Sequence, residues 1–284
     1  MLYTKQELRA RIRTVNSTRK ITSAMEMIAN VKLLKQRKLM ENNREYAQIL
    51  QDTVNEIVAK NPEVENPFLS EKKSPKKLTI LFSSDLGLCG AYNSNTMKLA
   101  EQVLEKSDPM IVIGTELYRQ LVNRGFNVIN EPTASDKVSF LDIKKFVEQG
   151  VQMYLRDEVS AVQLLYTMFV NTMTFRPMMD TLLPCIMKQQ EEKPETAGMH
   201  VETLFEPDAD TILSQLIPMM IDNVTYADWL ETKTAEQGSR RVAMKIATDN
   251  ADQLSDALKL EYNKARQASI TQEITEIIGG SAAV

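Results

Sequence analysis

The two ends of this chain lack the residues that usually end helices. No Gly or Pro occurs from Leu2 to Asn61, and from Met219 to Ile278 the only such residue is Gly238. Both stretches are rich in residues that favour helix, such as Ala, Leu, Met, Glu and Lys. At about 1.5 Å per residue, a helix of roughly 55 residues would extend about 80 Å, far more than a compact core requires. We therefore expect two very long helices and a protein built around a rod.

Composition narrows the class of protein. The chain has 284 residues, of which 43% are apolar and 25% charged, which is ordinary for a folded, water-soluble protein. No apolar run reaches the length of about 18 residues that a membrane span needs, so we expect membrane association only through a partner. Thr4 and Glu7 have capping-box spacing, which predicts a helix start too early to leave room for a cleaved leader. Cys89 and Cys185 are too few for a disulfide scaffold or a zinc site, which favours a cytoplasmic location.

The net charge of −4 is unevenly distributed, because the front of the chain is basic. The basic residues there are Lys5, Arg9, Arg11, Arg13, Arg19, Lys20, Lys32, Lys35, Arg37, Lys38 and Arg44. A nucleic-acid-binding arm has such a surplus, but it usually also has aromatic platforms, and this segment contains only Tyr3 and Tyr46. A solvated helix face and contact with an acidic protein surface are the other interpretations.

The middle of the chain has a different pattern. Pro62, Pro67 and Pro75 indicate a linker from Asn61 to Lys77. Short apolar runs then alternate with amphipathic ones, which predicts a mostly parallel, Rossmann-like α/β sheet. The expected strands are 78–84, 110–114, 126–129, 161–169 and 181–187, and the expected helices are 95–104, 116–123 and 141–155. The predicted division is a long helix at 1–60, a linker at 61–77, an α/β domain at 78–206 and a second long helix at 207–284.

If both long helices emerge from the same side of one domain and pair with each other, they must run antiparallel. The apolar spacing predicts an interrupted coiled-coil seam on each helix. On the front helix we expect Leu8, Ile12 and Val15, then Thr18 or Arg19 and Thr22, and then Met25 and Ile28. On the rear helix we expect Val242 and Ile246, then Asp249 or Asn250, and then Leu254, Leu258, Tyr262 and Ala265. Such polar interruptions predict loose mutual packing and contacts with other surfaces.

The last residues, from Ile277 to Val284, carry no charged side chain. An exposed apolar tip favours aggregation, so we expect Ile277, Ile278, Ala282, Ala283 and Val284 to lie inside a sleeve formed by other chains. The alternative is an ordinary frayed chain end.

The loop after the first predicted strand could suggest a nucleotide site, since Gly87 and Gly90 precede a predicted helix. The run matches neither G-x-G-x-x-G nor a P-loop, so a dinucleotide-binding enzyme is the weaker alternative. Cys89 is interpreted as a small packed residue, because no His lies near it in sequence.

Three segments resemble one family. They are Ile12-Arg-Thr-Val-Asn-Ser-Thr-Arg-Lys-Ile-Thr-Ser-Ala-Met-Glu-Met-Ile-Ala29, Ser84-Asp-Leu-Gly-Leu-Cys-Gly-Ala-Tyr-Asn93, and Met244-Lys-Ile-Ala-Thr-Asp-Asn-Ala251 with the run from Leu258 to Ile278. In this order they resemble the gamma subunit of bacterial F-type ATP synthases. The family usually has Arg in place of Leu86 and Gly in place of Ala91. These departures put any contact by that Arg in doubt.

The resemblance implies a rotor shaft that performs no chemistry and binds no cofactor or metal. Its terminal helices would pair inside a ring of three alpha and three beta subunits, and its α/β domain would contact the epsilon subunit and the ring of c subunits. The implied location is the cytoplasmic face of the bacterial membrane, reached through the membrane-embedded partner. Proton-driven rotation would present a different shaft face to each beta subunit in turn.

By motif position, the resemblance implies contacts with the beta subunits for Met25, Arg240, Arg266, Gln267 and Thr271. Ordinary roles as seam filler or solvated helix surface are the alternatives for each. Asp85, Gly87, Cys89 and Gly90 form the motif loop of the α/β domain.

Overall fold

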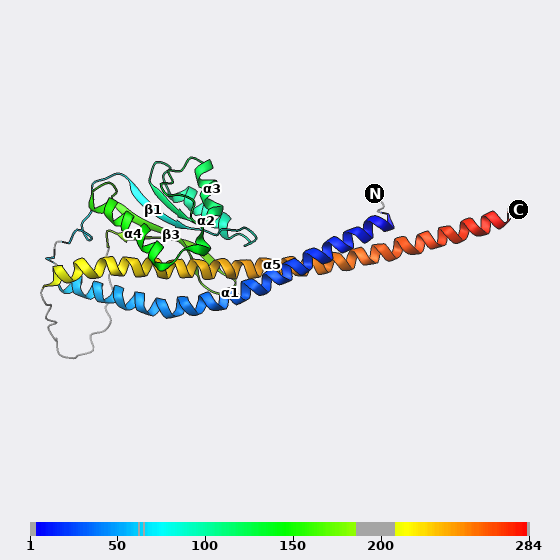
Figure 1. Ribbon diagram of the computed structural model, residues 1–284, viewed down its shortest axis with the longest axis horizontal. Helices are drawn as coiled ribbons and strands as arrows, with labels where there is room; N and C mark the ends of the chain where they lie inside the picture. The colour runs from blue at the N-terminus through cyan, green and yellow to red at the C-terminus, as the bar shows by residue number, and fades with distance from the viewer. Residues whose placement is uncertain (1–3, 62, 65, 186–207, 283–284) are drawn as a thin grey trace. The chain divides into compact units, whose positions relative to one another are not determined.

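The structure is a computed structural model that describes residues 4–61, 63–64, 66–185 and 208–282. The described side chains end at Ile278. The first and last helices of the described chain are very long: α1 runs over Lys5–Lys60 and α5 over Ala209–Ala282 (Figure 1). The predicted capping box begins α1, because the backbone N–H of Thr4 donates to Glu7 at 2.9 Å and that of Glu7 to the Thr4 hydroxyl at 3.3 Å. Asp208 caps α5 by accepting from the backbone N–H of Thr211 at 2.7 Å.

The chain forms two compact units. The first, called here the helical-pair unit, comprises Met1–Val31 and Arg240–Val284. The second, called the α/β unit, comprises Lys32–Ser239. Within each unit, segments of α1 and α5 lie side by side (Figure 1). The four-part division expected from the sequence stays a prediction.

A four-stranded sheet of order β2-β1-β3-β4 forms the centre of the α/β unit. Its strands are β1 (Lys77–Phe82), β2 (Met110–Ile113), β3 (Ala161–Phe169) and β4 (Phe175–Leu183). β1 pairs parallel with β2 and β3, and only the β3–β4 pair is antiparallel, so the expected mostly parallel sheet is confirmed. The other helices are α2 (Tyr92–Val103), α3 (Thr115–Asn123), the short 3-10 helix η1 (Ser135–Lys137) and α4 (Phe140–Leu155).

Alternate residues of the buried strands divide the core between the two faces of the sheet. Leu81 and Val112 pack in a cluster with residues of α2 and α3. Leu78 and Ile80 pack in a larger cluster with residues of α4, α1 and α5. The two long helices therefore contribute to the core of the α/β unit, which holds them against one face of its sheet.

Two predicted strands were wrong. Residues 126–129 form only an isolated bridge, between Val128 and Met110, and the chain next bridges β2 only at Thr133, opposite Ile113, so the pairing is too interrupted for a strand. The last strand begins at Phe175, six residues before the predicted start at 181, because it forms an antiparallel hairpin with β3. Pro177 lies inside this strand and makes it hard to predict from the sequence, because Pro usually argues against a strand. Pro is tolerated in a sheet mainly at its edge, where β4 lies.

Candidate partner-binding surface

In the helical-pair unit, polar side chains form hydrogen bonds across the seam between the two helices. The Thr248 hydroxyl donates to the Thr22 hydroxyl at 2.8 Å, and the Ser255 hydroxyl donates to the side-chain oxygen of Asn16 at 3.0 Å. At its far end, the Lys5 amine donates to the Ser269 hydroxyl at 2.7 Å. The residue number on α5 falls as that on α1 rises, so the helices run antiparallel, as expected from the sequence.

The seam includes a regular heptad spacing, which runs through small and hydroxyl-bearing residues as well as large apolar ones. On α5 this spacing includes Met244, Thr248, Ala251, Ser255, Leu258, Tyr262, Ala265 and Ser269, all of them buried or half-buried. On α1 it includes Leu8, Ile12, Val15, Arg19, Thr22, Glu26 and Ala29, which are also buried or half-buried. Each list advances in steps of four and three residues, which is the coiled-coil pattern.

This result corrects part of the predicted seam. Ile28 is 59% exposed while Ala29 is 1% exposed, so the seam passes through the small residue. Ile246 and Leu254 are likewise exposed, and Met244 and Ala251 lie in the seam instead. The buried hydroxyls at Thr22 and Thr248 are tolerated because each also donates to a backbone carbonyl of its own helix or to the other hydroxyl.

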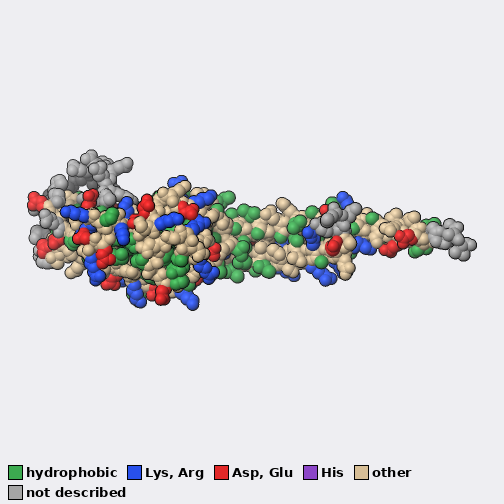
Figure 2. Space-filling model, turned by 90° about the horizontal axis from the view of Figure 1, so that it is seen from above, with side chains coloured by type: hydrophobic (Ala, Val, Ile, Leu, Met, Phe, Trp, Pro, Cys, Tyr) green, Lys and Arg blue, Asp and Glu red, His purple; other side chains and the backbone are tan. Residues whose placement is uncertain are grey.

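Several large apolar side chains nevertheless lie on the outside of the helical pair, and Figure 2 shows hydrophobic side chains on the surface between scattered charged ones. The exposed apolar residues of this unit include Ile21, Met27, Ile28, Val31, Ile246, Leu254, Leu260, Ile270, Ile274, Ile277 and Ile278. Single exposed apolar residues are normal, but this helix pair exposes many isoleucine and leucine side chains while its seam buries Thr22, Thr248 and Ser255 beside Leu8, Met244 and Leu258. This apolar outer surface indicates contact with another protein.

The predicted contact residues differ in accessibility. Arg266, Gln267 and Thr271 are exposed on α5, and the Thr271 hydroxyl donates to the Gln267 carbonyl at 3.0 Å. Met25 is half-buried, and Arg240 is buried in this chain. Their assignment as partner contacts stays a prediction.

The end of α5 extends past the last contacts with α1 that the described residues make. Those contacts are made by Lys5, which bonds Ser269 and lies 3.9 Å from the carboxylate of Glu273. Beyond them Ile277 and Ile278 are 72% and 62% exposed. The side chains of Ala282, Ala283 and Val284, which complete the predicted tip, lie outside the described part of the chain.

The polar groups of the motif loop in the α/β unit form hydrogen bonds with other segments of the protein. The Asp85 carboxylate accepts from the backbone N–H groups of Thr115, Ser135 and Asp136 at 3.2, 2.8 and 2.8 Å. The Cys89 carbonyl accepts from the Ser239 hydroxyl at 2.6 Å.

The two glycines of the motif loop, Gly87 and Gly90, differ in their structural requirements. Gly90 has φ +59°, a conformation that L side chains rarely adopt. A Cβ at Gly87 would meet nothing within 4 Å. The loop is therefore built to attach neighbouring segments to one another, which does not match the open cradle of a nucleotide site.

One stretch of α5 is buried all round, although it is rich in polar residues. Positions 229–240 are all buried, including Glu231, Lys233 and Glu236. Glu231 lies 2.8 Å from Arg44 of α1 and accepts from the backbone N–H of Phe169 at 3.3 Å. Burial raises the pKa of the Glu231 carboxyl, and the Arg44 charge partly offsets this. The sequence analysis did not predict that these residues are buried. A run of polar residues in the part of a long helix that follows an α/β domain could have indicated such buried polar contacts.

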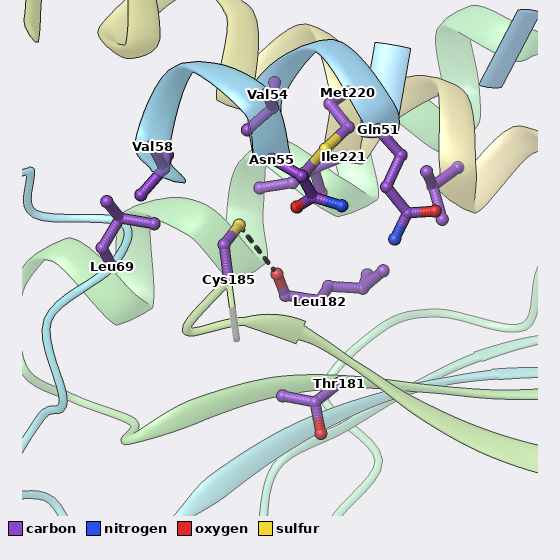
Figure 3. Close-up of a pocket in the computed structure, with 11 residues that line it drawn as sticks. Gln51, Val54, Asn55, Val58, Leu69, Thr181, Leu182, Cys185, Met220 and Ile221 are labelled. Atoms are coloured by element: carbon purple, nitrogen blue, oxygen red, sulfur yellow. Dashed lines mark hydrogen bonds between the residues drawn. The ribbon is translucent and has the colours of Figure 1, made fainter. Parts of the chain in front are cut away.

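A small cavity of about 60 Å³ lies in the α/β unit between α1, α5 and the end of β4 (Figure 3). Val54 and Val58 of α1, Ile221 of α5 and Cys185 line it. Ligand pockets usually measure about 300–1,000 Å³, so this space is too small for a nucleotide. Burial raises the pKa of the Cys185 thiol to about 12, which keeps it protonated and unreactive at neutral pH.

The described residues contain no cluster of three or more His, Cys, Asp or Glu side chains placed to hold a metal ion. Among the same residues, no helix is long and apolar enough to cross a bilayer.

The family profile and the curated relatives that this chain resembles point to the same family. A family profile described as ATP synthase matches residues 4–284. The chain is 36% identical over 283 residues to the ATP synthase gamma chain of Alkaliphilus metalliredigens, covering 98% of both chains. It is 34% identical over 296 residues to the sodium ion specific ATP synthase gamma chain of Acetobacterium woodii, again covering 98% of both.

Solved structures of lower identity share the fold. A chain from the central stalk and c ring of the Tetrahymena thermophila mitochondrial ATP synthase matches with a TM-score of 0.56 at 20% identity. That match covers 80% of this chain and 99% of the other. A chain of the Euglena gracilis mitochondrial ATP synthase matches with a TM-score of 0.56 at 17% identity, covering 92% and 95%.

Proposed function

Because this chain belongs to the ATP synthase gamma chain family, we propose that it is the central-stalk rotor subunit of an F-type ATP synthase. It is a non-catalytic subunit, and catalysis takes place on the beta subunits. Its partners are the ring of alpha and beta subunits, the epsilon subunit and the c ring. It is attached to the membrane through the complex, at the cytoplasmic face of a bacterial membrane.

The observation that carries this proposal is the exposed apolar surface of the helical pair. A shaft that turns inside a sleeve needs an outer surface that a partner accepts at several angles. Exposed apolar side chains such as Ile28, Ile246 and Leu254 supply non-directional contacts of that kind. The hydroxyl and alanine seam supports the same role, because small residues let the two helices pack closely into a narrow shaft.

The asymmetry of the helical pair explains how the shaft would couple the nucleotide sites of the beta subunits. Two antiparallel helices of different sequence present a different surface in every direction around their axis, so each beta subunit of the ring meets a different face. Rotation then moves the distinct nucleotide affinities from one beta subunit to the next, which couples distant sites through a rigid body.

Within this surface we propose Arg266, Gln267 and Thr271 as contacts with the beta subunits, joined by Met25 and Arg240. Exposure of the first three supports this role. We propose that Ile277, Ile278, Ala282, Ala283 and Val284 form the tip inside the sleeve, which their apolar character supports. The functional division then follows residues 1–60, 61–77, 78–206 and 207–284.

Reconstitution tests the proposal. The full chain is mixed with alpha and beta subunits of the same organism, and ATP hydrolysis and co-elution on gel filtration are measured. We expect the chain alone to be inactive and the mixture to hydrolyse ATP as a complex that contains the chain. A hexamer of alpha and beta subunits that excludes the chain would contradict the proposal.

The Arg266→Ala, Gln267→Ala double variant tests the local assignment. A hydrogen bond to a charged group contributes about 1.5–3 kcal/mol, so we expect turnover of the assembled complex to fall by about tenfold or more. The matched control is Asn263→Ala with Lys264→Ala, which removes two exposed polar side chains of the same helix. Equal rates for the two double variants would remove Arg266 and Gln267 from the contact surface.

A further inference from the structure

The Lys233 side chain of α5 is only 4% exposed, yet it carries a charge. Its Nζ lies 2.6 Å from a carboxylate oxygen of Asp136 and 2.8 Å from one of Glu236. It also donates to the Ser135 hydroxyl at 3.3 Å. The ammonium group has three N–H donors, and these three acceptors match them. Lys233, Glu236, Ser135 and Asp136 are called here the Lys233 cluster.

The cluster joins segments that lie far apart in sequence. Lys233 and Glu236 belong to α5, whereas Ser135 and Asp136 belong to η1. Asp136 also accepts from Lys32 of α1, at 3.4 Å. One carboxylate therefore links both long helices to the α/β layer.

The motif loop holds η1 in place for this contact. Asp85 accepts from the backbone N–H groups of Ser135 and Asp136, both at 2.8 Å. The same loop bonds α5 a second time through the Ser239 hydroxyl and the Cys89 carbonyl, at 2.6 Å. Lys233 and Ser239 are six residues apart, or about 9 Å along the helix axis.

Two further bonds fix α5 to the sheet. The backbone N–H of Thr167 donates to the Thr232 hydroxyl at 3.1 Å, and that of Phe169 to Glu231 at 3.3 Å. Hydrophobic contact alone is non-directional and would let a helix turn or slide against the sheet. Hydrogen bonds and buried ion pairs depend on distance and angle, so they define one rotation angle and one register of the helix.

We propose that the Lys233 cluster, held by Asp85, locks the rotation angle of α5 against the α/β layer so that torque on this layer turns the shaft. This inference rests on the proposed rotor function and adds the residues that transmit its torque. In this view, Lys233 is a positioning residue. A load applied to the α/β layer passes through η1 into α5, which continues as a single helix into the helical-pair unit.

Asp136→Asn is the decisive variant. It weakens the contact between η1 and α5 and leaves Lys233 paired with Glu236, so the buried ammonium group keeps a counter-charge. The double variant Lys233→Met, Glu236→Gln removes the buried charges together and provides a second test. Asp249→Asn is the matched control, because it breaks an ion pair of 2.9 Å with Lys245 inside α5 alone.

The experiment uses the assembled complex with a probe bead attached through Val122→Cys, an exposed position on α3. We measure the angular variance of the bead in the stalled complex, together with ATP-driven proton pumping per ATP hydrolysed. For Asp136→Asn and the double variant we expect the angular variance to rise about twofold and pumping per ATP to fall, with unchanged ATP hydrolysis. For Asp249→Asn we expect wild-type values of all three.

The outcomes separate the two proposals. Wild-type angular variance and pumping in correctly assembled Asp136→Asn and double-variant complexes would overturn the role of the cluster. A wild-type chain that neither assembles nor rotates would overturn the rotor function itself. Equal loss of hydrolysis and pumping, with a lowered melting temperature, would show that the cluster only stabilises the fold and would overturn its role in torque.

Discussion

Replacing Gly238 of α5 with alanine tests how closely the helix packs on the sheet of the α/β unit. A Cβ at this position would lie 2.8 Å from two ring atoms of Phe175 and 3.6 Å from the ring of Phe169. Overpacking of this kind costs about 1–3 kcal/mol. Alanine is favoured over glycine inside a helix by about 1 kcal/mol, which offsets part of that cost. We therefore expect Gly238→Ala to lower the free energy of unfolding by roughly 0–2 kcal/mol.

Urea unfolding of the full chain measures this change, with the single tryptophan as the probe. Trp229 is buried on α5 and stacks on Tyr226 with ring centroids 5.5 Å apart, so unfolding of this region changes its fluorescence. In a Phe175→Leu background the clash is relieved, and Gly238→Ala should raise the free energy of unfolding by about 1 kcal/mol. The two substitutions should thus be strongly non-additive.

Additivity within about 0.5 kcal/mol would refute the close packing of Gly238 on Phe175. Gly87→Ala is the control, because a Cβ there has no neighbour within 4 Å. We expect it to change the free energy of unfolding by less than about 0.5 kcal/mol.

Two further predictions concern the seam and the dependence on pH. Thr248→Val should lower the free energy of unfolding by about 1 kcal/mol, whereas adding Thr22→Val should restore most of it, because the second change removes the buried hydroxyl oxygen that has lost its donor. Urea unfolding checks this, and a double variant that costs the sum of its parts would contradict it. For Asp136 burial is the largest single effect and opposes the charge, but the hydrogen bonds and charges of Lys233 and Lys32 together outweigh it and lower the pKa below 3.8. For Lys233 burial again opposes the charge, but the carboxylates of Glu236 and Asp136 together raise its pKa above 10.5. The stability from Asp136 is therefore present above pH 3.8 and lost as the pH falls through its lowered pKa, and that from Lys233 is present below pH 10.5 and lost as the pH rises through its raised pKa. The difference in melting temperature between the wild type and Asp136→Asn should shrink outside these limits, and a difference that stays constant with pH would show that the ion pair contributes nothing.

The sequence alone determined the long helices and the class of the central domain. Helix length follows from the local absence of Gly and Pro, and the capping box of Thr4 and Glu7 is equally local. The alternation of apolar runs predicted the mostly parallel sheet, since buried parallel strands are apolar throughout. The motifs at both ends and in the middle were enough by themselves to indicate the family.

The tertiary structure decided which face of each helix is the seam. From apolarity alone Ile28 was placed in the seam, but the close approach of α5 selects the small neighbour Ala29. The choice depends on the partner helix, because the buried Thr22 hydroxyl accepts a hydrogen bond from Thr248 of α5 in addition to donating to the Arg19 carbonyl of its own helix. Local spacing carries no information about that partner.

The polar contacts inside the α/β unit also depend on tertiary structure. Lys233 and Asp136 are nearly a hundred residues apart, and in the sequence each reads as an ordinary charged surface residue. Only the fold brings η1 against α5 and removes water from around the ammonium group, which turns a common ion pair into a directional contact. The sequence therefore determined that there are two long helices and an α/β domain, and the tertiary structure decided which polar contacts join α5 to η1 and the sheet within the α/β unit.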